Sequence, residues 1–562
     1  MDERRERMST YANARSLAVC SIALITASLG LACYDKPSRG EVRTVQVERR
    51  APAAQAAHEN AEERERRSAS AAPLVANGPV TLTVGERRQL AESKGWTCNE
   101  TTCSITTNIQ QLPDAVFEAV PAAAKELPQA NPSGVGVVTS ALQTAETTVL
   151  NVAGTSVSEP AATYFRSDVG SIVSMNVFTN ISSNQLLHAC SRDYLSWCMY
   201  QHNVSANPNG GDPAPAFEDV GTNFLHVAML DNAGTNFRWY HRTGNPCPSP
   251  CGGAQTWTQC NIPLPYAPGG DYPWFVYDRI NDRRWLLFNA GSFFDPAYSS
   301  IMIAEVPQPS DGTCPAIATY HIPNCTWTGD QRFVRGTMDS GGDLHLVFLD
   351  SQPNPDEYVH TRFDTNTRTW QCDRHVMSTF VRPAGSCGAC AAGYQGIGNC
   401  LRSTFNPSIA IDDTSTPNTL ITAISTNDGT REARLRIFRS TNDGANWNMV
   451  NQSDGNTYQP YAVFTRTPFS AVADRFHIIS LWDVDSAVNS SNVRTLSWRS
   501  TNDGQSFTPT LISNSRSVAQ NGACYWGDYH AIAADRSSTG VFYGYTDHSV
   551  SPWRIRGRLI NE

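Results

Sequence analysis

Two nearly identical segments, sixty residues apart, constrain the fold of this chain more than any other feature. The segment Arg439-Ser-Thr-Asn-Asp-Gly-Ala-Asn-Trp447 recurs as Arg499-Ser-Thr-Asn-Asp-Gly-Gln-Ser-Phe507. In each, asparagine, aspartate and glycine bend the chain ahead of an aromatic residue, which predicts a tight hairpin whose ring folds back into a hydrophobic layer. Two copies at this spacing indicate a repeated supersecondary unit.

Short β-rich runs recur through the second part of the chain at a similar spacing. They are Phe224–Leu230, Trp285–Phe288, Leu344–Phe348, Leu420–Ile424, Phe476–Trp482 and Val541–Tyr545. Repeated sheets of this kind predict a β-propeller of six or seven blades rather than a single sandwich. The last blade is one strand short, so we expect Ala162–Phe165 to complete it and to close the ring, which removes sheet edges.

The repeated segments match the Asp-box pattern Ser-x-Asp-x-Gly-x-x-Trp/Phe, with asparagine in the first acidic place. The chain therefore resembles the Asp-box (BNR-repeat) sialidase-like β-propellers. The resemblance implies an all-β propeller over residues 161–562, with the boxes on its rim and away from the active centre. The box residues are Ser440, Asn442, Asp443, Gly444 and Trp447 in one copy, and Ser500, Asn502, Asp503, Gly504 and Phe507 in the other.

The N-terminal part has the order of an export signal. Arginines precede an apolar run from Leu17 to Ala32, which is shorter than the roughly 20 residues that span a bilayer. Gly30-Leu-Ala-Cys33 resembles a bacterial lipobox, so residues 1–33 predict a signal peptide with lipidation at Cys33; a plain signal-peptidase site near Ala32 is the alternative. Residues 34–74, rich in alanine, glutamate and arginine, predict a disordered tether. Residues 75–160 predict a small N-terminal region, either an α+β domain or a pro-segment.

The cysteine count supports export independently. Sixteen cysteines, less Cys20 in the signal and Cys33, leave fourteen, an even number that suits pairing in an oxidising compartment. Three pairs are close enough to close short loops: Cys98 with Cys103, Cys190 with Cys198, and Cys314 with Cys325. Cys387-Gly-Ala-Cys390 is interpreted as a structural disulfide, because no second such pair makes it a zinc or redox motif. The formal charge of −9 argues against nucleic acid as a partner.

The resemblance also implies where catalytic residues would lie. Family sialidases use a tyrosine nucleophile, a glutamate that activates it, an acid/base aspartate and three arginines that clamp the substrate carboxylate. Tyr529 stands where the family's tyrosine opens the final blade, and Asp528 adjoins it. Their alternative roles are a buried aromatic residue and a turn cap.

The partner residues follow the family pattern less closely. Phe165-Arg166 resembles the family's first arginine motif without its Ile-Pro, and Arg431 and Arg434 are candidates for another clamp arginine. Asn406-Pro-Ser408 stands where the glutamate is expected, so sialidase activity proper is not expected. The remaining interior glutamates are Glu218, Glu305, Glu357 and Glu432.

Three functions stay open on this sequence. The first is a surface propeller that binds or processes glycans at its central mouth, with Trp526 and Tyr529. The second is a polysaccharide lyase using Tyr529 with His530, or Tyr240 with His241. The third is an adhesin or scaffold without chemistry. In each case we expect a monomer that touches a membrane only through an N-terminal lipid, and no cofactor, with a structural calcium ion left open.

Overall fold

The computed structural model describes residues 82–120 and, with gaps of which the longest is 381–405, residues 146–561. The expected signal peptide, Cys33 and the tether therefore lie outside the described residues. Residues 52–562 form one compact unit. Its described part contains one helix and thirty-three strands, so the all-β prediction is confirmed. No helix of the described part has the length and apolar character needed to span a membrane.

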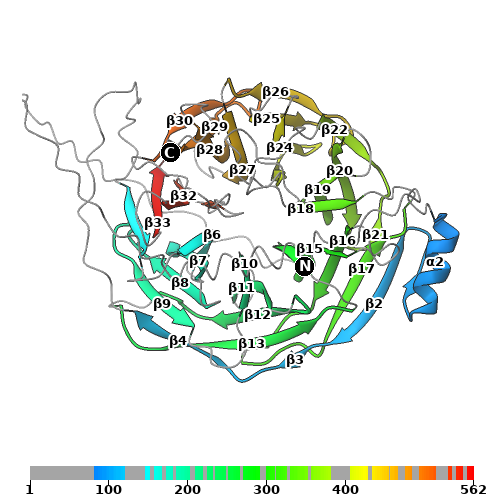
Figure 1. The fold of residues 1–562 in the computed structure, drawn as a ribbon, viewed down its shortest axis with the longest axis horizontal. Coiled ribbons are helices and arrows are strands. Elements are labelled where there is room, and N and C mark those ends of the chain that lie inside the picture. The colour runs from blue at the N-terminus through cyan, green and yellow to red at the C-terminus, as the bar shows by residue number, and fades with distance from the viewer. Residues whose placement is uncertain are drawn as a thin grey trace, which may run out of the picture. The chain divides into compact units, whose positions relative to one another are not determined.

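The strands form seven antiparallel blades of a propeller (Figure 1). Blade 1 contains β6 (Val157–Arg166), β7 (Ile172–Ile181), β8 (Leu186–Ser191) and β9 (Cys198–His202). Blade 2 contains β10 (Asn209–Phe217), β11 (Phe224–Asp231), β12 (Asn236–Thr243) and β13 (Gln255–Pro263). Blade 3 contains β14 (Asp271–Asp278), β15 (Arg283–Gly291), β16 (Ser299–Val306) and β17 (Ile317–Pro323).

The other four blades repeat this order. Blade 4 contains β18 (Gln331–Met338), β19 (Asp343–Asp350), β20 (Asp356–Asp364), β21 (Thr369–Trp370) and β22 (His375–Phe380). Blade 5 contains β23 (Ser408–Asp412), β24 (Thr419–Asn427), β25 (Ala433–Ser440) and β26 (Asn448–Gln452). Blade 6 contains β27 (Asn456–Thr465), β28 (Arg475–Asp483), β29 (Val493–Ser500) and β30 (Thr508–Leu511). Blade 7 contains β31 (Ala531–Ala534), β32 (Gly540–Asp547), β33 (Arg554–Asn561) and β5 (Thr147–Leu150).

The first strands of the blades line the axis. They contact one another in a closed cycle of β6, β10, β14, β18, β23, β27, β31 and β6 again. Because the strands of each blade alternate in direction, the starts of the inner strands and the hairpins between third and fourth strands lie at opposite ends of the blade. We call the first end the axial mouth and the second end the turn face.

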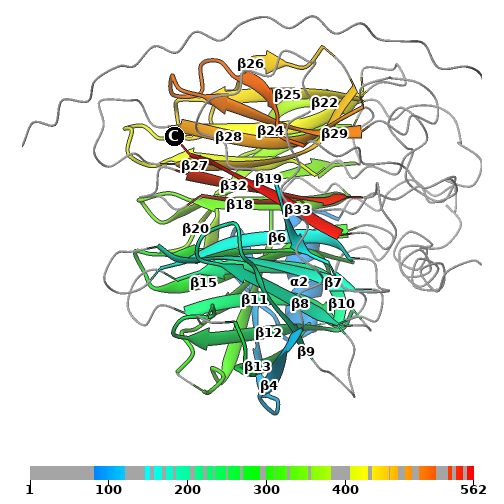
Figure 2. The ribbon, with the colours of Figure 1, turned by 90° about the vertical axis from the view of Figure 1, so that its left-hand side faces the viewer.

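Ring closure depends on an N-terminal strand that the sequence pattern does not reveal. Strand β5 is the outer strand of blade 7 and pairs with β33, through Leu150 opposite Ile555. In Figure 2, β33 of blade 7 lies beside β6 of blade 1. The expectation that Ala162–Phe165 would complete the last blade is wrong, because these residues belong to β6, the inner strand of blade 1.

The start of the closing strand is held by a buried charged group. The carboxylate of Glu146, just before β5, accepts from the Tyr545 hydroxyl of β32 and pairs with Arg556 of β33, with Nε and Oε1 3.1 Å apart. Both charged side chains are almost fully buried. A buried carboxylate of this kind persists only when it is paired, so the ion pair fixes the position of the closing strand.

Other N-terminal strands extend the outer edges of blades 1 to 3. Helix α2 (Val84–Ser93) precedes β1 (Thr97–Cys98) and β2 (Thr102–Asn108), and β2 pairs with β17. Strand β3 (Gln110–Gln111) pairs with β13, and β4 (Ala115–Val120) pairs with both β13 and β9. The described strands between residues 75 and 160 thus pair with the propeller sheets.

The two repeated segments form the same turn at the turn face of blades 5 and 6. In each, the serine hydroxyl donates to an asparagine side chain and accepts from a glycine N–H, as Ser440 does with Asn442 at 2.9 Å and Gly444 at 3.0 Å. Asp443 and Asp503 both have φ of 54°. Trp447 packs edge-on against His360 of blade 4, and Phe507 is buried in the cluster shared by blades 5 and 6.

Five disulfides join ten of the described cysteines. Cys98–Cys103 is as predicted, but Cys190 pairs with Cys247 and Cys314 with Cys260, so the other two short-loop pairs are wrong. The interblade disulfides are Cys190–Cys247, Cys198–Cys251, Cys260–Cys314 and Cys325–Cys372. Proximity in sequence misled the prediction because the loops of neighbouring blades face one another. Cys387 and Cys390 lie outside the described residues.

Leu150→Ala should reveal how much the closing strand contributes to stability. The Leu150 side chain is fully buried in the cluster of blades 1 and 7, so its truncation should lower the free energy of unfolding by about 2–5 kcal/mol. Leu195→Ala is the control, because Leu195 is 53% exposed. Denaturant titration measures both, and equal stabilities would show that β5 is not needed for closure.

Gly444→Ala should test the packing of the first box against blade 4. A Cβ atom at this position, with φ of +82°, would overlap the His360 ring. We expect a loss of about 2–5 kcal/mol, from left-handed backbone strain and overpacking together. Gly244→Ala is the matched control, because φ is +75° there but no atom is within 4 Å of the added Cβ. It should cost only about 1–2 kcal/mol in the same thermal or denaturant unfolding measurement.

Candidate functional site

A repeated backbone irregularity marks the axial mouth. Asp212, Tyr272, Phe333 and Gln459 have φ between 53° and 60°, a left-handed conformation that non-glycine residues rarely adopt. Each lies at a register shift near the start of the inner strand of blade 2, 3, 4 or 6. Strained residues of this kind persist only where the surrounding structure holds them, and they cluster at functional sites.

The residue two positions after each left-handed residue is the first to rejoin the regular ladder. These residues are Ala214, Trp274, Arg335 and Tyr461. In the sequence, this repeat is marked by a recurring proline. A proline precedes the equivalent residue in five blades, at Pro160, Pro213, Pro273, Pro407 and Pro460, and Val334 and His530 occupy the same place in the other two.

Three large side chains of the repeat meet across the axis. The Arg335 guanidinium lies 5.0 Å from the ring centre of Trp274 and 5.8 Å from that of Tyr461, and its Nη2 donates to the Tyr461 hydroxyl at 3.4 Å. Blades 4 and 6 are not neighbours in the ring, so the contact between Arg335 and Tyr461 reaches past blade 5. Cations stack favourably on aromatic faces, and the benefit grows when water is excluded.

The cluster has one accessible side chain and several buried ones. Trp274 is partly exposed, and its Nε1 donates to the Gly336 carbonyl at 2.8 Å, which fixes the ring. Arg335 and Tyr461 are almost fully buried. The side chain of Asn406, ahead of β23, donates to the Tyr461 hydroxyl at 3.4 Å. We call Trp274, Arg335, Asn406, Tyr461 and His530 the mouth cluster.

His530 brings an uncharged imidazole to this cluster. Its ring stands edge-on to Tyr461, with the centroids 6.0 Å apart. Neither ring nitrogen has a hydrogen-bond partner within the described part of the chain. Burial lowers the pKa of His530 to about 3, so the imidazole is neutral at neutral pH and resists protonation, while its N–H can still donate a hydrogen bond.

The structure describes only part of the predicted set of catalytic residues. Tyr529, Asp528, Trp526 and Arg431 lie outside the described residues. Arg166 is the last residue of the inner strand β6, so it stands at the turn face, at the opposite end of the blade from the mouth. This position does not favour a clamp role at the mouth. Arg434 is the second residue of β25 and donates to the carbonyls of Ser453 and Asp454, beside the outer strand β26.

A second copy of the Asp-Tyr sequence bears on Tyr529. Gly270-Asp-Tyr-Pro-Trp274 aligns with Gly527-Asp-Tyr-His-Ala531, so Tyr272 is the counterpart of Tyr529. Tyr272 is buried and packs edge-on against Phe333 at 4.7 Å, while Asp271 accepts from the Tyr272 N–H at 3.0 Å. The catalytic roles predicted for Tyr529 and Asp528 stay predictions, because both residues lie outside the described part of the chain.

Glu218, Glu305 and Glu357 stand away from the inner-strand starts, whereas Glu159 is the third residue of the inner strand β6. Glu218 follows β10 at the turn face and is buried against His226 and Arg284, with 3.0 Å from Oε2 to His226 Nε2. Burial would raise the pKa of Glu218, but hydrogen bonds from His226 and Arg284 outweigh it and lower the pKa. Glu357 pairs with Arg374 in blade 4. Glu159 is therefore the described glutamate whose backbone lies at the axial mouth.

The Tyr240–His241 pair, considered for lyase chemistry, lies inside blade 2. Both residues belong to β12, the third strand, and both are fully buried. His241 packs against Trp239 and close to Cys260, and burial lowers its pKa to about 3. The third strand of a blade does not line the axis, so this pair does not contribute to the mouth.

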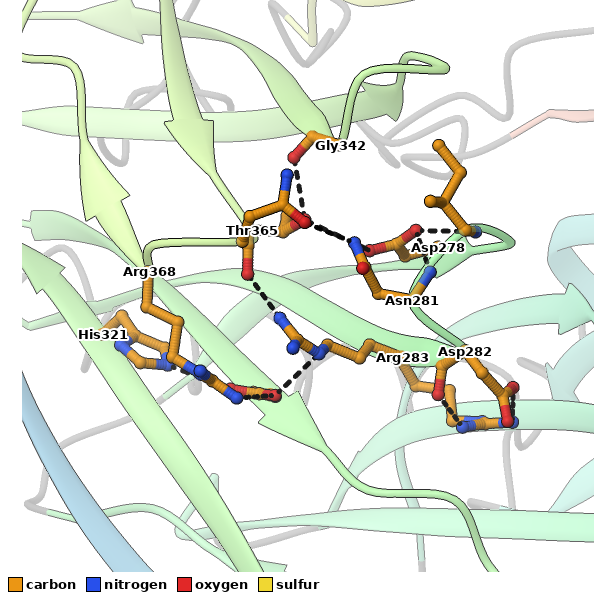
Figure 3. Close-up of polar contacts among 12 residues, drawn as sticks. Asp278, Asn281, Asp282, Arg283, His321, Gly342, Thr365 and Arg368 are labelled. Carbon is orange, nitrogen blue, oxygen red and sulfur yellow. Dashed lines mark hydrogen bonds and ion pairs between the residues drawn. The ribbon is translucent and has the colours of Figure 1, made fainter.

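Blades 3 and 4 share a polar network at the turn face, shown in Figure 3. The Arg368 guanidinium donates to both carboxylate oxygens of Glu305, at 2.7 and 3.0 Å, and Arg283 Nε lies 3.5 Å from the same group. His321 Nε2 is 3.6 Å from Glu305. Burial would raise the pKa of the Glu305 carboxyl, but His321 and Arg368 outweigh it and lower the pKa to about 2. The network is a structural joint between blades.

No known protein family profile matches the chain, and no curated protein matches it. Among solved structures, a lectin of Burkholderia pseudomallei is 12% identical, covering 70% of this chain and 93% of its own, with a TM-score of 0.41. A Hadza microbial sialidase is 10% identical, with coverage of 70% and 74% and a TM-score of 0.39. A Penicillium chrysogenum arabinanase is 13% identical, with coverage of 62% and 93% and a TM-score of 0.36.

The Glu305 joint should make stability pH-dependent in acid. A carboxyl whose pKa falls from 4.5 to about 2 on folding stabilises the folded state above pH 4.5 and loses that contribution as the pH falls towards 2. Its full contribution is at most about 3 kcal/mol. Glu305→Gln should flatten the fall in unfolding free energy between pH 4.5 and 2, relative to wild type. An unchanged pH profile in denaturant titrations would contradict the assignment.

Proposed function

We propose that this chain is an exported β-propeller that binds a glycan at its axial mouth. The observation that carries the proposal is the partly exposed Trp274 ring, held by its bond to Gly336 and stacked on Arg335 beside Tyr461. A rigid aromatic face gives a sugar ring an apolar surface, and fixed polar groups beside it orient the hydroxyls. Export follows from the N-terminal signal pattern and agrees with the interblade disulfides.

Hydrolysis is the first reaction by which this mouth would cleave a glycan. Asp271 begins β14 and Asp330 immediately precedes β18, so two neighbouring blades bring a carboxylate to the mouth. Asp330 is held by Arg332, with 2.8 Å between Oδ2 and Nε. Glycoside hydrolysis needs two carboxyl groups, one as acid and one as base or nucleophile. We infer that Asp271 and Asp330 are candidates for that pair.

Eliminative cleavage is the second candidate, and the contact of the Tyr461 hydroxyl with Arg335 and Asn406 is the observation that favours it. A lyase removes the proton next to a sugar carboxylate, which needs an unprotonated base and groups that bind the carboxylate. His530 is neutral and stands beside Tyr461, while Arg335 and Asn406 both contact the Tyr461 hydroxyl. An adhesin without chemistry is the third function, and it would show binding alone.

Trp274→Ala should test whether glycans bind at the axial mouth. With neutral and acidic glycans screened by calorimetry, the loss of stacking should weaken binding about fivefold or more, since aromatic contacts contribute about 1 kcal/mol or more beyond their buried area. Trp274→Phe keeps a ring and should retain most of the affinity. Product analysis of wild type then distinguishes unchanged glycan, hydrolysed ends and unsaturated ends that absorb in the ultraviolet.

Two further variants locate the chemistry. Tyr461→Phe removes only the hydroxyl that contacts Arg335 and Asn406, so it should lower turnover far more than affinity if the mouth is catalytic. Tyr529→Phe should change neither, if Tyr529 follows its buried counterpart Tyr272. Glycan binding that survives Trp274→Ala unchanged in a folded protein would place the binding site elsewhere.

A further inference from the structure

One strand of the N-terminal segment is shared by the outer edges of two blades. Strand β4 pairs with β13 of blade 2 through Ala115 to Phe117, and with β9 of blade 1 through Phe117 to Val120. The two pairings meet at Phe117, which lies opposite both Gln255 and His202. If β4 left its place, backbone edges of both β9 and β13 would become accessible.

The ring of His202 holds this strand through an aromatic stack. It lies on Phe117 with the ring centres 4.8 Å apart and the planes 17° from parallel. Tyr240 of β12 stands edge-on to the same imidazole, and its hydroxyl is 3.4 Å from Nδ1. Phe117 is fully buried and also contacts Tyr240 and Trp257, while His202 is 2% exposed. Blade 1, blade 2 and β4 thus meet in one aromatic cluster around His202.

We propose that His202 is an acid-sensitive latch, which holds β4 on blades 1 and 2 while its imidazole is neutral and releases the strand when it is protonated. A neutral imidazole packs in an apolar cluster, and its Nδ1 accepts from the Tyr240 hydroxyl when the ring proton is on Nε2. A protonated imidazole has no acceptor atom, and its charge is costly to bury. Because Phe117 covers one face of the ring, the departure of β4 gives the charged ring access to water.

The charge that acts on His202 has the same sign as the imidazolium. Burial lowers the pKa of His202 to about 4, and Arg238 of β12 lowers it further in the same direction. The other titratable groups of this cluster are Tyr240, Tyr200 of β9 and His188 of β8, which stacks on Tyr200 and whose own pKa burial lowers to about 3. These groups are uncharged at neutral pH, so they do not stabilise a proton on His202.

The charged side chains on the neighbouring strands are directed elsewhere. Glu118, the residue after Phe117 in β4, points to the opposite side of the strand and is exposed. Arg242 of β12 lies over Trp257, with 5.7 Å from the guanidinium carbon to the ring centre. Neither side chain offers the His202 ring a counter-charge, so protonation is coupled to the release of β4.

The direction of the pH effect follows from these pKa values. With β4 attached, the pKa of His202 is about 4, and in the released state it returns to its ordinary value of 6.5. The released state therefore takes up a proton that the attached state does not bind. Attachment is fully favoured above pH 6.5 and loses this contribution as the pH falls towards 4. Between pH 7.5 and 5, the equilibrium constant for release should rise about 30-fold.

The release would be confined to the strand. The disulfides Cys190–Cys247 and Cys198–Cys251 join blades 1 and 2 without any contribution from β4. The two blades therefore stay together when the strand leaves. Acid would then expose two unpaired strand edges on an otherwise folded propeller, a surface that can pair with another extended chain.

Hydrogen exchange of the full, oxidised chain at pH 7.5, 6 and 5, read by mass spectrometry and corrected for intrinsic exchange, tests the latch. Peptides of β4 should show the roughly 30-fold rise in opening, while peptides of β25 should not. Strand β25 is the reference because the described strands of blade 5 contain no histidine. An opening of β4 that does not change with pH would overturn the proposal. A rise of the same size in β25 would show global unfolding and would also reject it.

Matched histidine variants identify the group that titrates. His202→Phe keeps a ring that stacks on Phe117 but cannot be protonated, so its β4 opening should be the same at pH 7.5 and 5. His360→Phe is the control, because His360 of β20 is also fully buried with a lowered pKa but belongs to blade 4. It should keep the wild-type response. A response that survives in His202→Phe, or disappears in His360→Phe, would assign it to another group. If His202→Phe does not fold, His202→Gln carries the same expectation.

Discussion

The pairing of β5 with β33 is the constraint on which the rest of the propeller depends. Each blade presents its faces to two neighbours, so the inner strands form a ring only if the last blade is complete. The strand that completes it is short, and the buried pair between Glu146 and Arg556 fixes its position. Without that strand, β33 would be an open edge, and the contacts between blades 7 and 1 would lose their support.

The fold was largely predictable because its signals are local. The two repeated turns depend on a serine, an asparagine and a glycine within a few residues, and the hydrogen bonds of Ser440 and Ser500 follow from that spacing. The closing strand was not predictable in the same way. Thr147–Leu150 is too short to stand out, and its partner is separated from it by nearly the whole propeller. The disulfide predictions failed for a related reason. Packing between blades, rather than closeness in sequence, determines that Cys190 pairs with Cys247.

The candidate site was also predictable only in part. Sequence reasoning placed function at the starts of the inner strands, but chose Tyr529 by likeness to a family position. The structure describes a contact between Arg335 and Tyr461, which are 126 residues apart and belong to different blades. No local pattern predicts such a pair. The prolines at 160, 213, 273, 407 and 460 were the signal available, because a recurring proline marks equivalent positions across blades.

The closing strand also determines when the molecule can finish folding. Its partner Ile555 follows the other six blades in the chain, so during synthesis from the N-terminus the outer strand of blade 7 must wait until those blades and β33 have been made. Until then the apolar residues Val149 and Leu150 have no sheet to join. A nascent propeller of this design is an open arc with exposed edges, and any cellular factor that shields such edges would act on it before β33 is complete.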